Sequence, residues 1–420
     1  MSITRMPLVV IATATALVTA GCTSGGGSDE GGESGPVTIE VSAWKGNEAE
    51  PAGLPELIEK FEAENPDITV ELTYIGRGDT DVVLPPRLQG GNPPDVMMTD
   101  MALVDQWGNQ GLLADLGTDS EWYGRIPDPL QTTLTSDGAA YIMPLEVIGM
   151  GNFVNTDLLA EAGVDAPPAT IDELKEACGK LADAGINPMI FTGGFSAPLT
   201  VIANGLESSS EAPSALGSGD ASFVDDASFN DSIDLIGELA DAQCFDASAQ
   251  SGLDPWSTAL TEFQAGNFAM MPQGAWNIAA FDQVDGLNYV FTPIPGADGP
   301  GVALDLFGIG WSVAEASEHQ EAARTFVDFF ADAENLQVLL DAESAYSPFD
   351  DGASGTPELT AAYDEARTAG ATIMYPFSTL EWPKPLEQEI WDSLTAYLLD
   401  SSKPADSVLE RWDTSVADSN

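Results

Sequence analysis

The stretch directly after Pro36 constrains the fold of this 420-residue chain most, because its hydrophobic period changes twice in quick succession. Residues 37–44 alternate apolar and polar side chains, which is the period of a half-buried strand. Apolar residues then recur at helical spacing over 54–61, and Asn65-Pro66 predicts the end of that helix. Alternation returns over 68–74. Strand, helix and strand in this order are the unit of a parallel sheet with crossover helices, so we expect an α/β fold.

The same signals recur further along the chain. Residues 170–173 have the spacing of a capping box and predict a helix start, and Gly185 predicts the end of that helix. We expect a strand over 186–191 and a surface loop in the Ser/Gly/Asp-rich stretch 207–220. Apolar residues at helical spacing predict further helices in 317–330, 386–394 and 405–416.

The N-terminal residues indicate export. The apolar run 7–20 has about 14 residues, fewer than the roughly 20 that span a bilayer, so it is typical of a secretory signal. Residues 19–22, Thr-Ala-Gly-Cys, resemble a bacterial lipobox, in which Cys22 receives a lipid and becomes the mature N-terminus. Thr19 stands where that pattern usually has Leu. The alternative is an ordinary cleaved signal followed by an incidental cysteine.

The residues after Cys22 strengthen the lipoprotein interpretation. They are rich in Gly and Ser with scattered acids, a composition that is typical of flexible coil. We therefore expect a signal peptide over 1–21, a flexible tether over 22–36 and an exported protein anchored to the outer face of the cell membrane. Because one acyl chain anchors only marginally, firm attachment needs several chains on the cysteine.

Two further cysteines, Cys178 and Cys244, are expected to form a disulfide, because paired cysteines in an oxidising compartment are more often bonded than free. The alternative is a pair of buried free thiols. Neither cysteine has a nearby His or a C-x-x-C motif, so we predict no metal site.

The composition excludes several classes of function. With 68 acidic and 13 basic residues the formal net charge is −55, which repels nucleic acid and leaves membrane anchoring to the lipid. The acidity is typical of a surface suited to a saline or acidic exterior, and capture of cations is the alternative. His319, the only histidine, lies in a polar helix start, which argues against a Ser-His-Asp triad and a His-rich metal centre. We expect no catalysis and no cofactor.

Five segments in order resemble motifs of a known family: 37–48, 61–72, 88–100, 143–174 and 262–281. They are similar to the carbohydrate-binding extracellular solute-binding proteins (family 1) of ABC importers, although Val154 stands where that family usually has Tyr. The resemblance implies a periplasmic-binding-protein-like fold of two α/β lobes joined by a hinge, with ligand in the interlobe cleft. A length well above that of one core also favours two domains. The expected lobes are discontinuous: 37–147 with 310–345, and 148–305 with 350–420.

Sugar capture needs aromatic rings against the apolar faces of the pyranose, and carboxylates or amides for its hydroxyl groups. Trp44 and Trp276 follow predicted strands, and the resemblance places both at the ligand. Among polar groups, the resemblance points to the loop acid Glu48 and to Asp100. Glu146 stands at the first crossing into the second lobe, and Asn277 directly follows Trp276. The complete expected binding set is Trp44, Glu48, Asp100, Glu146, Trp256, Trp276, Asn277, Trp311 and Trp382. For each of these residues the alternative is core packing or a solvated surface position.

The resulting hypothesis is a monomeric, lipid-anchored receptor that captures a mono- or oligosaccharide and delivers it to an ABC import permease. Closure of the two lobes would be driven by ligand that contacts both. One alternative keeps the fold but binds a polyamine, a peptide or another solute. A second alternative, a secreted carbohydrate-active enzyme, would need two opposed carboxylates, which cannot be recognised among so many acids.

Overall fold

The structure is a computed structural model, and it describes residues 36–45, 53–136, 138–250, 252–297, 299–400 and 403–419. Cys22, the predicted signal peptide and Glu48 lie outside the described residues. All the elements described below belong to one unit, Pro36–Asn420. Within the described part of the chain, no helix is both long and apolar enough to span a bilayer.

The first sheet begins with the strand–helix–strand unit that the sequence predicts. β1 (Val37–Ala43) pairs in parallel with β2 (Ile68–Tyr74) along its whole length, and also with β3 (Val96–Thr99). Two antiparallel strands, β12 (Gly310–Val313) and β6 (Met143–Pro144), complete the order β2-β1-β3-β12-β6. A separate hairpin joins β4 (Thr135–Ser136) to β5 (Ala139–Ala140).

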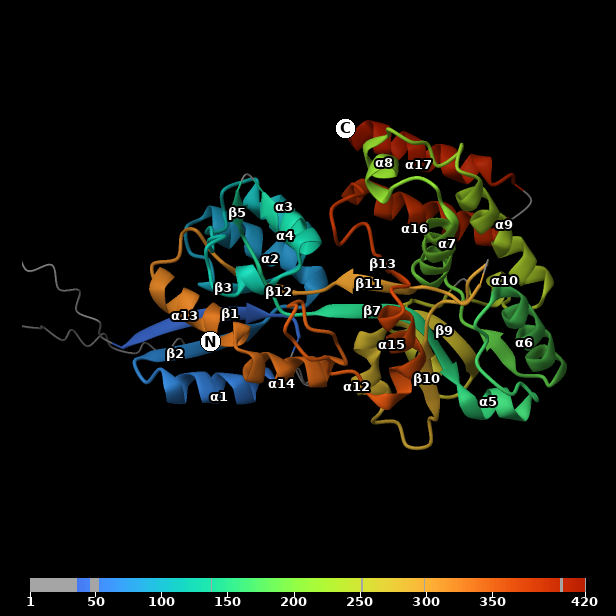
Figure 1. The fold of residues 1–420 in the computed structure, drawn as a ribbon, viewed down its shortest axis with the longest axis horizontal. Helices are drawn as coiled ribbons and strands as arrows, with labels where there is room; N and C mark the ends of the chain where they lie inside the picture. Colours follow the sequence, from blue (N-terminus) through green and yellow to red (C-terminus); the bar gives the residue numbers. More distant parts are fainter. Residues whose placement is uncertain are drawn as a thin grey trace, which may run out of the picture. The chain divides into compact units, whose positions relative to one another are not determined.

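Helices pack on both faces of this sheet (Figure 1). The predicted helix is α1, and its apolar residues at helical spacing are buried. The helices that accompany the first sheet are α1 (Leu54–Glu64), α2 (Arg77–Gln89), α3 (Met101–Gly108), η1 (Tyr123–Arg125), α4 (Asp128–Leu134), α13 (Gln320–Ala331) and α14 (Ala333–Glu343).

The second sheet is organised around one long buried strand, β7 (Val147–Asn155). Its order is β13-β11-β7-β9-β8, and β10 also pairs with β7. Its other strands are β8 (Asn187–Met189), β9 (Phe268–Gly274), β10 (Tyr289–Thr292), β11 (Ala303–Phe307) and β13 (Thr372–Met374). The expectation of parallel pairing is wrong here for β7, which is antiparallel to β9, β10 and β11. The pairs β8–β9 and β11–β13 are parallel.

We call the first sheet and its helices the first part of the molecule, and the second sheet and its helices the second part. Several helices of the second part were not predicted, and one of them, α8, contradicts a stated expectation. α8 lies in the stretch 207–220 that was interpreted as a loop. A helix forms there because Pro213 suits the first helical turn and Gly219 adopts the left-handed conformation that ends it. The capping box of Thr170 and Glu173 is confirmed at the start of α6. These helices are α5 (Thr156–Glu161), α6 (Ile171–Asp183), α7 (Ser196–Ser208), α8 (Pro213–Ser218), α9 (Ala227–Asp241), α10 (Ala247–Gln250), α11 (Thr258–Gln264), η2 (Ala275–Asn277), α12 (Ile278–Phe281), η3 (Glu358–Thr360), α15 (Ala361–Thr368), α16 (Lys384–Leu399) and α17 (Asp406–Ser419).

The buried apolar residues form two clusters, and β7 contributes to both. Phe153 belongs to the cluster that also contains the core of the first sheet, whereas Met150 and Val154 belong to the cluster beneath α6, α7, α9, α16 and α17. This division follows from the alternation of side chains along a strand. The predicted disulfide is confirmed: Cys178 of α6 bonds Cys244, which follows α9.

Candidate functional site

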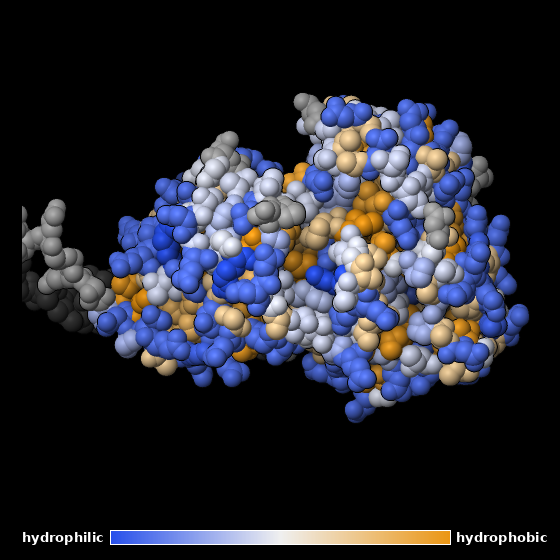
Figure 2. All heavy atoms as spheres, in the orientation of Figure 1, coloured by the Kyte–Doolittle hydropathy of each residue, from blue (hydrophilic) through white to orange (hydrophobic). Residues whose placement is uncertain are grey.

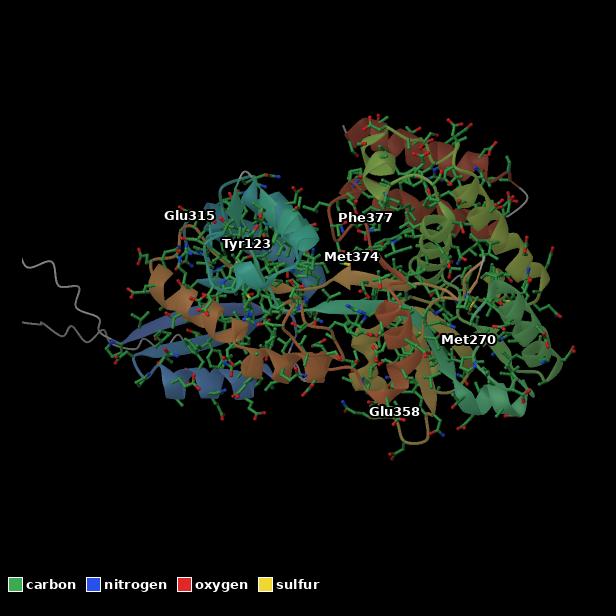
Figure 3. All side chains as sticks on the ribbon, viewed as in Figure 1. Tyr123, Met270, Glu315, Glu358, Met374 and Phe377 are labelled. Atoms are coloured by element: carbon green, nitrogen blue, oxygen red, sulfur yellow. A yellow bond between two sulfur atoms is a disulfide. The ribbon has the colours of Figure 1, made fainter. Side chains whose placement is uncertain are left out.

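A cavity of about 470 Å³ is lined by residues from both parts of the molecule. α3 and α4 contribute from the first part, and the second part contributes the end of β13 and residues 379–381. In the orientation shared by Figures 2 and 3, hydrophobic residues gather in a hollow where Met374 and Phe377 lie. The volume is in the range of small-ligand sites, and a position between two sheets is a common one for such sites.

The sequence reasoning did not identify any residue that lines this cavity. Met101, Tyr141 and Met374 give it an apolar wall, and Asp105 and Glu381 add carboxylates. Leu380 is the most unusual lining residue, since its φ is 59° and 40% of its surface is exposed. A left-handed Leu is rare, and sparsely populated backbone conformations cluster at ligand sites. The lining residues come from separate helices and a turn, so no local periodicity marks them.

Two predicted site residues of the first part, Trp44 and Asp100, are joined by Arg77. The guanidinium of Arg77 lies 5.6 Å from the centre of the Trp44 ring. Its Nε donates to Asp100 Oδ2 at 2.6 Å, and a second nitrogen donates to Asp81 at 2.9 Å. Asp100 Oδ1 meanwhile accepts the backbone N–H of Leu103 and caps α3. The sequence reasoning missed Arg77, which holds an aromatic ring and a carboxylate together.

A second aromatic group lies in the other part of the molecule, where Phe195, Trp256 and Trp276 pack together. The rings of Trp256 and Trp276 are stacked with centroids 6.5 Å apart, and Phe195 lies 4.6 Å from Trp256. Trp256 is 48% exposed. Gly274 is required beneath the Trp276 ring, because a Cβ there would fall 2.1 Å from it. Asn277 is buried and donates to the Gly274 carbonyl, so it holds the turn that carries Trp276.

Glu146 is buried and already engaged by a cation. Lys45 Nζ donates to Glu146 Oε1 at 2.9 Å and to Glu343 Oε2 at 2.8 Å. Burial raises the pKa of Glu146, and Lys45 opposes that change. Burial by itself would lower the pKa of Lys45, but the two carboxylates outweigh it and hold that pKa above its ordinary value. The predicted contact between Glu146 and ligand would therefore compete with an ion pair.

Two of the predicted tryptophans require a correction, because both lie in the hydrophobic clusters. Trp311 is fully buried on β12 and packs edge-on against the Phe326 and Phe330 rings, each 5.5 Å away. Trp382 is also buried, packs on Phe223 and donates its indole N–H to the Pro213 carbonyl. Contact with ligand would require either ring to leave its core, so we assign both to packing.

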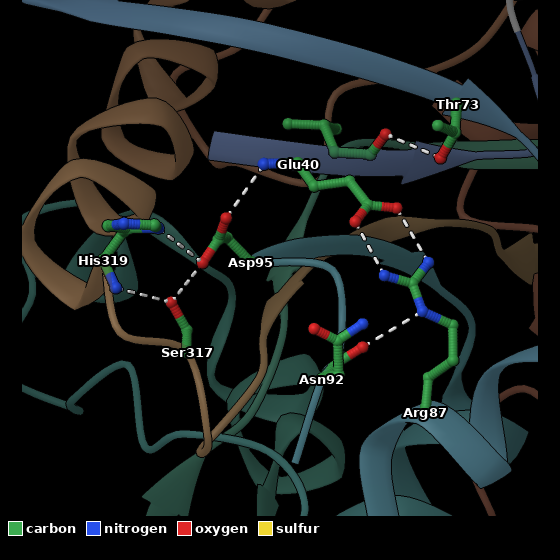
Figure 4. Close-up of polar contacts among 8 residues, drawn as sticks. Glu40, Thr73, Arg87, Asn92, Asp95, Ser317 and His319 are labelled. Carbon is green, nitrogen blue, oxygen red and sulfur yellow. Dashed lines mark hydrogen bonds and ion pairs between the residues drawn. The ribbon is translucent and has the colours of Figure 1, made fainter. Parts of the chain in front are cut away.

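A polar network around Asp95 shows where the only histidine lies (Figure 4). Asp95 accepts the Glu40 N–H at 2.8 Å and the Ser317 hydroxyl at 2.6 Å, and His319 Nδ1 lies 3.2 Å from it. His319 occupies the start of α13, as its position in the sequence predicts. This network ties β1, the start of β3 and α13 together. Among the described residues, no group of three or more His, Cys, Asp or Glu is placed to hold a metal ion.

Residues 45–337 match the family described as bacterial extracellular solute-binding protein. The chain belongs to this family. Its members are binding proteins of ABC import rather than enzymes, in agreement with the absence of catalysis that the sequence predicts. This solute-binding protein has the two-sheet α/β architecture of its family.

This solute-binding protein is similar to two relatives in sequence and to a third protein in structure. A putative binding protein of Brucella abortus is 28% identical over 160 residues, which cover 38% of either chain. The multiple sugar-binding protein of Streptococcus mutans is 22% identical and covers 74% of each chain. The GacH receptor of Streptomyces glaucescens, solved unliganded and with acarbose, is 21% identical with a TM-score of 0.74, over 91% of this chain and 99% of that one.

Proposed function

We propose that this solute-binding protein is a lipid-anchored extracellular receptor that binds an oligosaccharide between its two sheets and delivers it to an ABC import permease. The observation that carries the proposal is the cavity between the two parts of the molecule. Residues from both parts line it. Family membership supplies the transport role. Two of the similar proteins, named for multiple sugars and solved with acarbose, support a carbohydrate ligand.

Two carboxylates of the cavity lining, and a tryptophan pair that lies outside that lining, support a carbohydrate ligand. Trp256 has an exposed aromatic surface and is backed by Trp276, which suits the apolar C–H face of a sugar ring. The carboxylates of Asp105 and Glu381 line the cavity and are strong acceptors for hydroxyl groups. We propose Trp44, Asp100, Trp256 and Trp276 as ligand contacts, while Glu48, Glu146 and Asn277 remain predictions. The proposed lobes are 37–147 with 310–345, and 148–305 with 350–420.

A thermal-shift screen of the mature protein against mono- and oligosaccharides tests this proposal. A bound ligand raises the unfolding temperature by mass action, so one sugar class should shift it in proportion to the logarithm of ligand concentration. In calorimetry, Trp256→Ala and Trp276→Ala should each weaken binding of that sugar by about two- to tenfold, the range for the loss of one aromatic contact. Trp256→Phe should retain most of the affinity.

A matched pair of leucines locates the binding surface. Leu380 lines the cavity and is 40% exposed, whereas Leu399 is 60% exposed at the end of α16 and lies away from the cavity lining. Leu380→Ala should weaken sugar binding, and Leu399→Ala should leave it unchanged. If polyamines or peptides stabilise the protein and no sugar does, the ligand is one of those solutes and not a carbohydrate. Release of reducing ends from oligosaccharides would contradict a pure binding role.

The lipid anchor is a separate proposal with its own test. In a bacterial host that processes lipoproteins, the full-length chain should incorporate labelled palmitate and fractionate with membranes. Cys22→Ser should abolish both properties while leaving the folded binding domain intact. Palmitate incorporation by the Cys22→Ser variant would show that Cys22 is not the modified residue. We also propose that the protein acts as a monomer, which light scattering with and without sugar checks.

A further inference from the structure

Three chain segments pass between the elements of the two sheets. Residues 145–146 join β6 to β7, residues 308–309 join β11 to β12, and the chain leaves α14 at Ser344 toward the second sheet. Val147, directly after the first segment, exchanges both backbone hydrogen bonds with Tyr346 of the third segment, at 2.9 and 2.8 Å. Any movement of one sheet relative to the other must change backbone angles in these three segments.

One buried ion cluster contacts all three segments. Lys45 lies just beyond β1 and binds Glu146 of the first segment and Glu343, the last residue of α14 before the third segment. Gly308 of the second segment packs directly on the Glu146 side chain, since a Cβ there would fall 2.5 Å from Glu146 Oε1. The Gly308 amide also donates to the Glu146 carbonyl at 3.2 Å. We name Lys45, Glu146 and Glu343 the hinge cluster.

Fold stability alone does not account for these buried charges. The exposed fractions of Lys45, Glu146 and Glu343 are 8%, 1% and 6%. Within the described residues, Glu146 Oε2 has no hydrogen-bond partner although it is buried. Buried ion clusters are often replaceable by apolar residues without loss of stability, and their best-attested use is to specify one arrangement of the chain. The geometry indicates which arrangement this cluster specifies, namely the mutual placement of the three connecting segments.

We propose that Lys45 is a positioning residue of the hinge, which holds the three connecting segments in one register and so sets the separation of the two sheets before ligand binds. Lys45 directly follows Trp44, so the same contact fixes the backbone that carries a proposed ligand ring. The inference rests on the two-sheet hinge of the proposed function, but it requires no particular ligand.

A spin-label distance measurement on the ligand-free protein tests the proposal. Gln110 and Glu410 are exposed residues just beyond α3 and on α17, two helices that contribute to a second cavity of about 710 Å³. Cysteines at these positions, in the full mature chain with Cys22→Ser, accept labels because Cys178 and Cys244 are bonded to each other. The test variant is Glu343→Gln, which leaves a charge-neutral Lys45–Glu146 pair and removes the ion pair between Lys45 and the end of α14.

The expected result is a Gln110–Glu410 distance distribution that broadens or moves by more than about 2 Å in Glu343→Gln, the scale of hinge rearrangements. A triple variant that leaves no buried charge in the cluster is Lys45→Met/Glu146→Gln/Glu343→Gln. This variant should change the distance distribution further, even if it melts at the same temperature as the wild type. The matched control is Glu238→Gln, which removes one carboxylate from the surface cluster around Lys175. Glu238→Gln should superimpose on the wild type.

The proposal is overturned if the Glu343→Gln distribution superimposes on the wild type, including the case in which only the melting temperature changes. Glu343→Gln decides the question by itself if the triple variant does not fold. The measurement contains no sugar, so a failed carbohydrate screen leaves this result standing, and a failed hinge test leaves carbohydrate binding open.

Discussion

Two clusters in this protein have the same composition, one lysine and two carboxylates, in opposite environments. Lys45 binds Glu146 and Glu343 at 2.9 and 2.8 Å, with side chains between 1% and 11% exposed. Lys175 of α6 binds Asp172 and Glu238 at 3.1 and 2.9 Å, with side chains between 29% and 94% exposed. Water screens the second cluster but is excluded from the first. The distances are alike, so solvent rather than geometry decides what each lysine does.

Removal of Lys45 has the largest expected effect. Lys45→Met leaves Glu146 and Glu343 buried without a cation, and breaking a buried pair in this way lowers the free energy of unfolding by about 3–5 kcal/mol. Urea denaturation followed by circular dichroism measures the loss. The Lys45→Met/Glu146→Gln/Glu343→Gln variant should recover most of it. A loss below about 1 kcal/mol in the single variant would place Lys45 in the same class as Lys175.

Removal of the disulfide is expected to have the second largest effect on the free energy of unfolding. The ion pairs of α6 are exposed and weak, so this bond is what attaches the helix firmly. Cys178 of α6 and Cys244 are 66 residues apart, and the Lys175–Glu238 ion pair joins α6 to α9, the helix that Cys244 follows, at the surface. Cys178→Ala/Cys244→Ala should lower the free energy of unfolding by about 2–4 kcal/mol, because the open chain is less constrained when unfolded. Mass mapping without reductant should show the two cysteines linked. Equal stability with and without the bond would contradict the comparison.

The ion pair between Asp305 and Arg367 is expected to be intermediate in strength between the two lysine clusters, and its pH dependence tests this. Arg367 lies 2.9 Å from this buried carboxylate, yet burial outweighs the arginine and raises the pKa of Asp305 to about 6. The folded protein therefore holds a proton that the unfolded chain has released between about pH 4 and pH 6. This group's stabilisation is present at about pH 4 and falls, by about 3 kcal/mol at most, as the pH rises through 6.

Comparison with Asp305→Asn isolates that contribution from those of the other carboxylates. Between pH 4.5 and pH 7 the free energy of unfolding of the wild type should fall relative to that of Asp305→Asn. A difference that stays constant over this range would show that Asp305 ionises in the folded protein as it does in the unfolded chain.

Removal of Lys175 has the smallest expected effect. Lys175→Met should change the free energy of unfolding by less than about 1 kcal/mol, because exposed ion pairs gain little over hydrated ions. Even that small change should diminish in high salt, where surface charges are screened. A salt-independent loss as large as that of Lys45→Met would remove the distinction between the two clusters.

Local sequence signals predicted the local parts of the fold. The alternation in β1 and β2, the helical spacing in α1 and the capping box of α6 each involve residues close in the chain, and each is present. The disulfide was also predicted, because only two cysteines remained to pair. The antiparallel surroundings of β7 were not predicted, since they depend on how the chain returns from one sheet to the other.

The candidate site was harder to predict because it depends on distant contacts. Lys45 and Glu343 are 298 residues apart in sequence, so no spacing rule connects them. Trp311 and Trp382 have the residue type expected of a sugar platform, but burial assigned them to cores, and burial cannot be read from a single tryptophan. The prediction made the opposite error at Leu380, which lines the cavity but was not expected in the site. An apolar residue in a turn carries no sign of such a position in the sequence.

The stacked Trp256–Trp276 pair has an optical consequence. Trp256 is half-exposed to water, whereas Trp311, Trp382 and Trp412 are enclosed in the clusters. A ligand that covers Trp256 would displace water from that indole and move its emission toward shorter wavelength, while the enclosed rings continued to emit unchanged. The protein would thus signal occupancy through its own fluorescence, with no attached dye and whichever solute it carries.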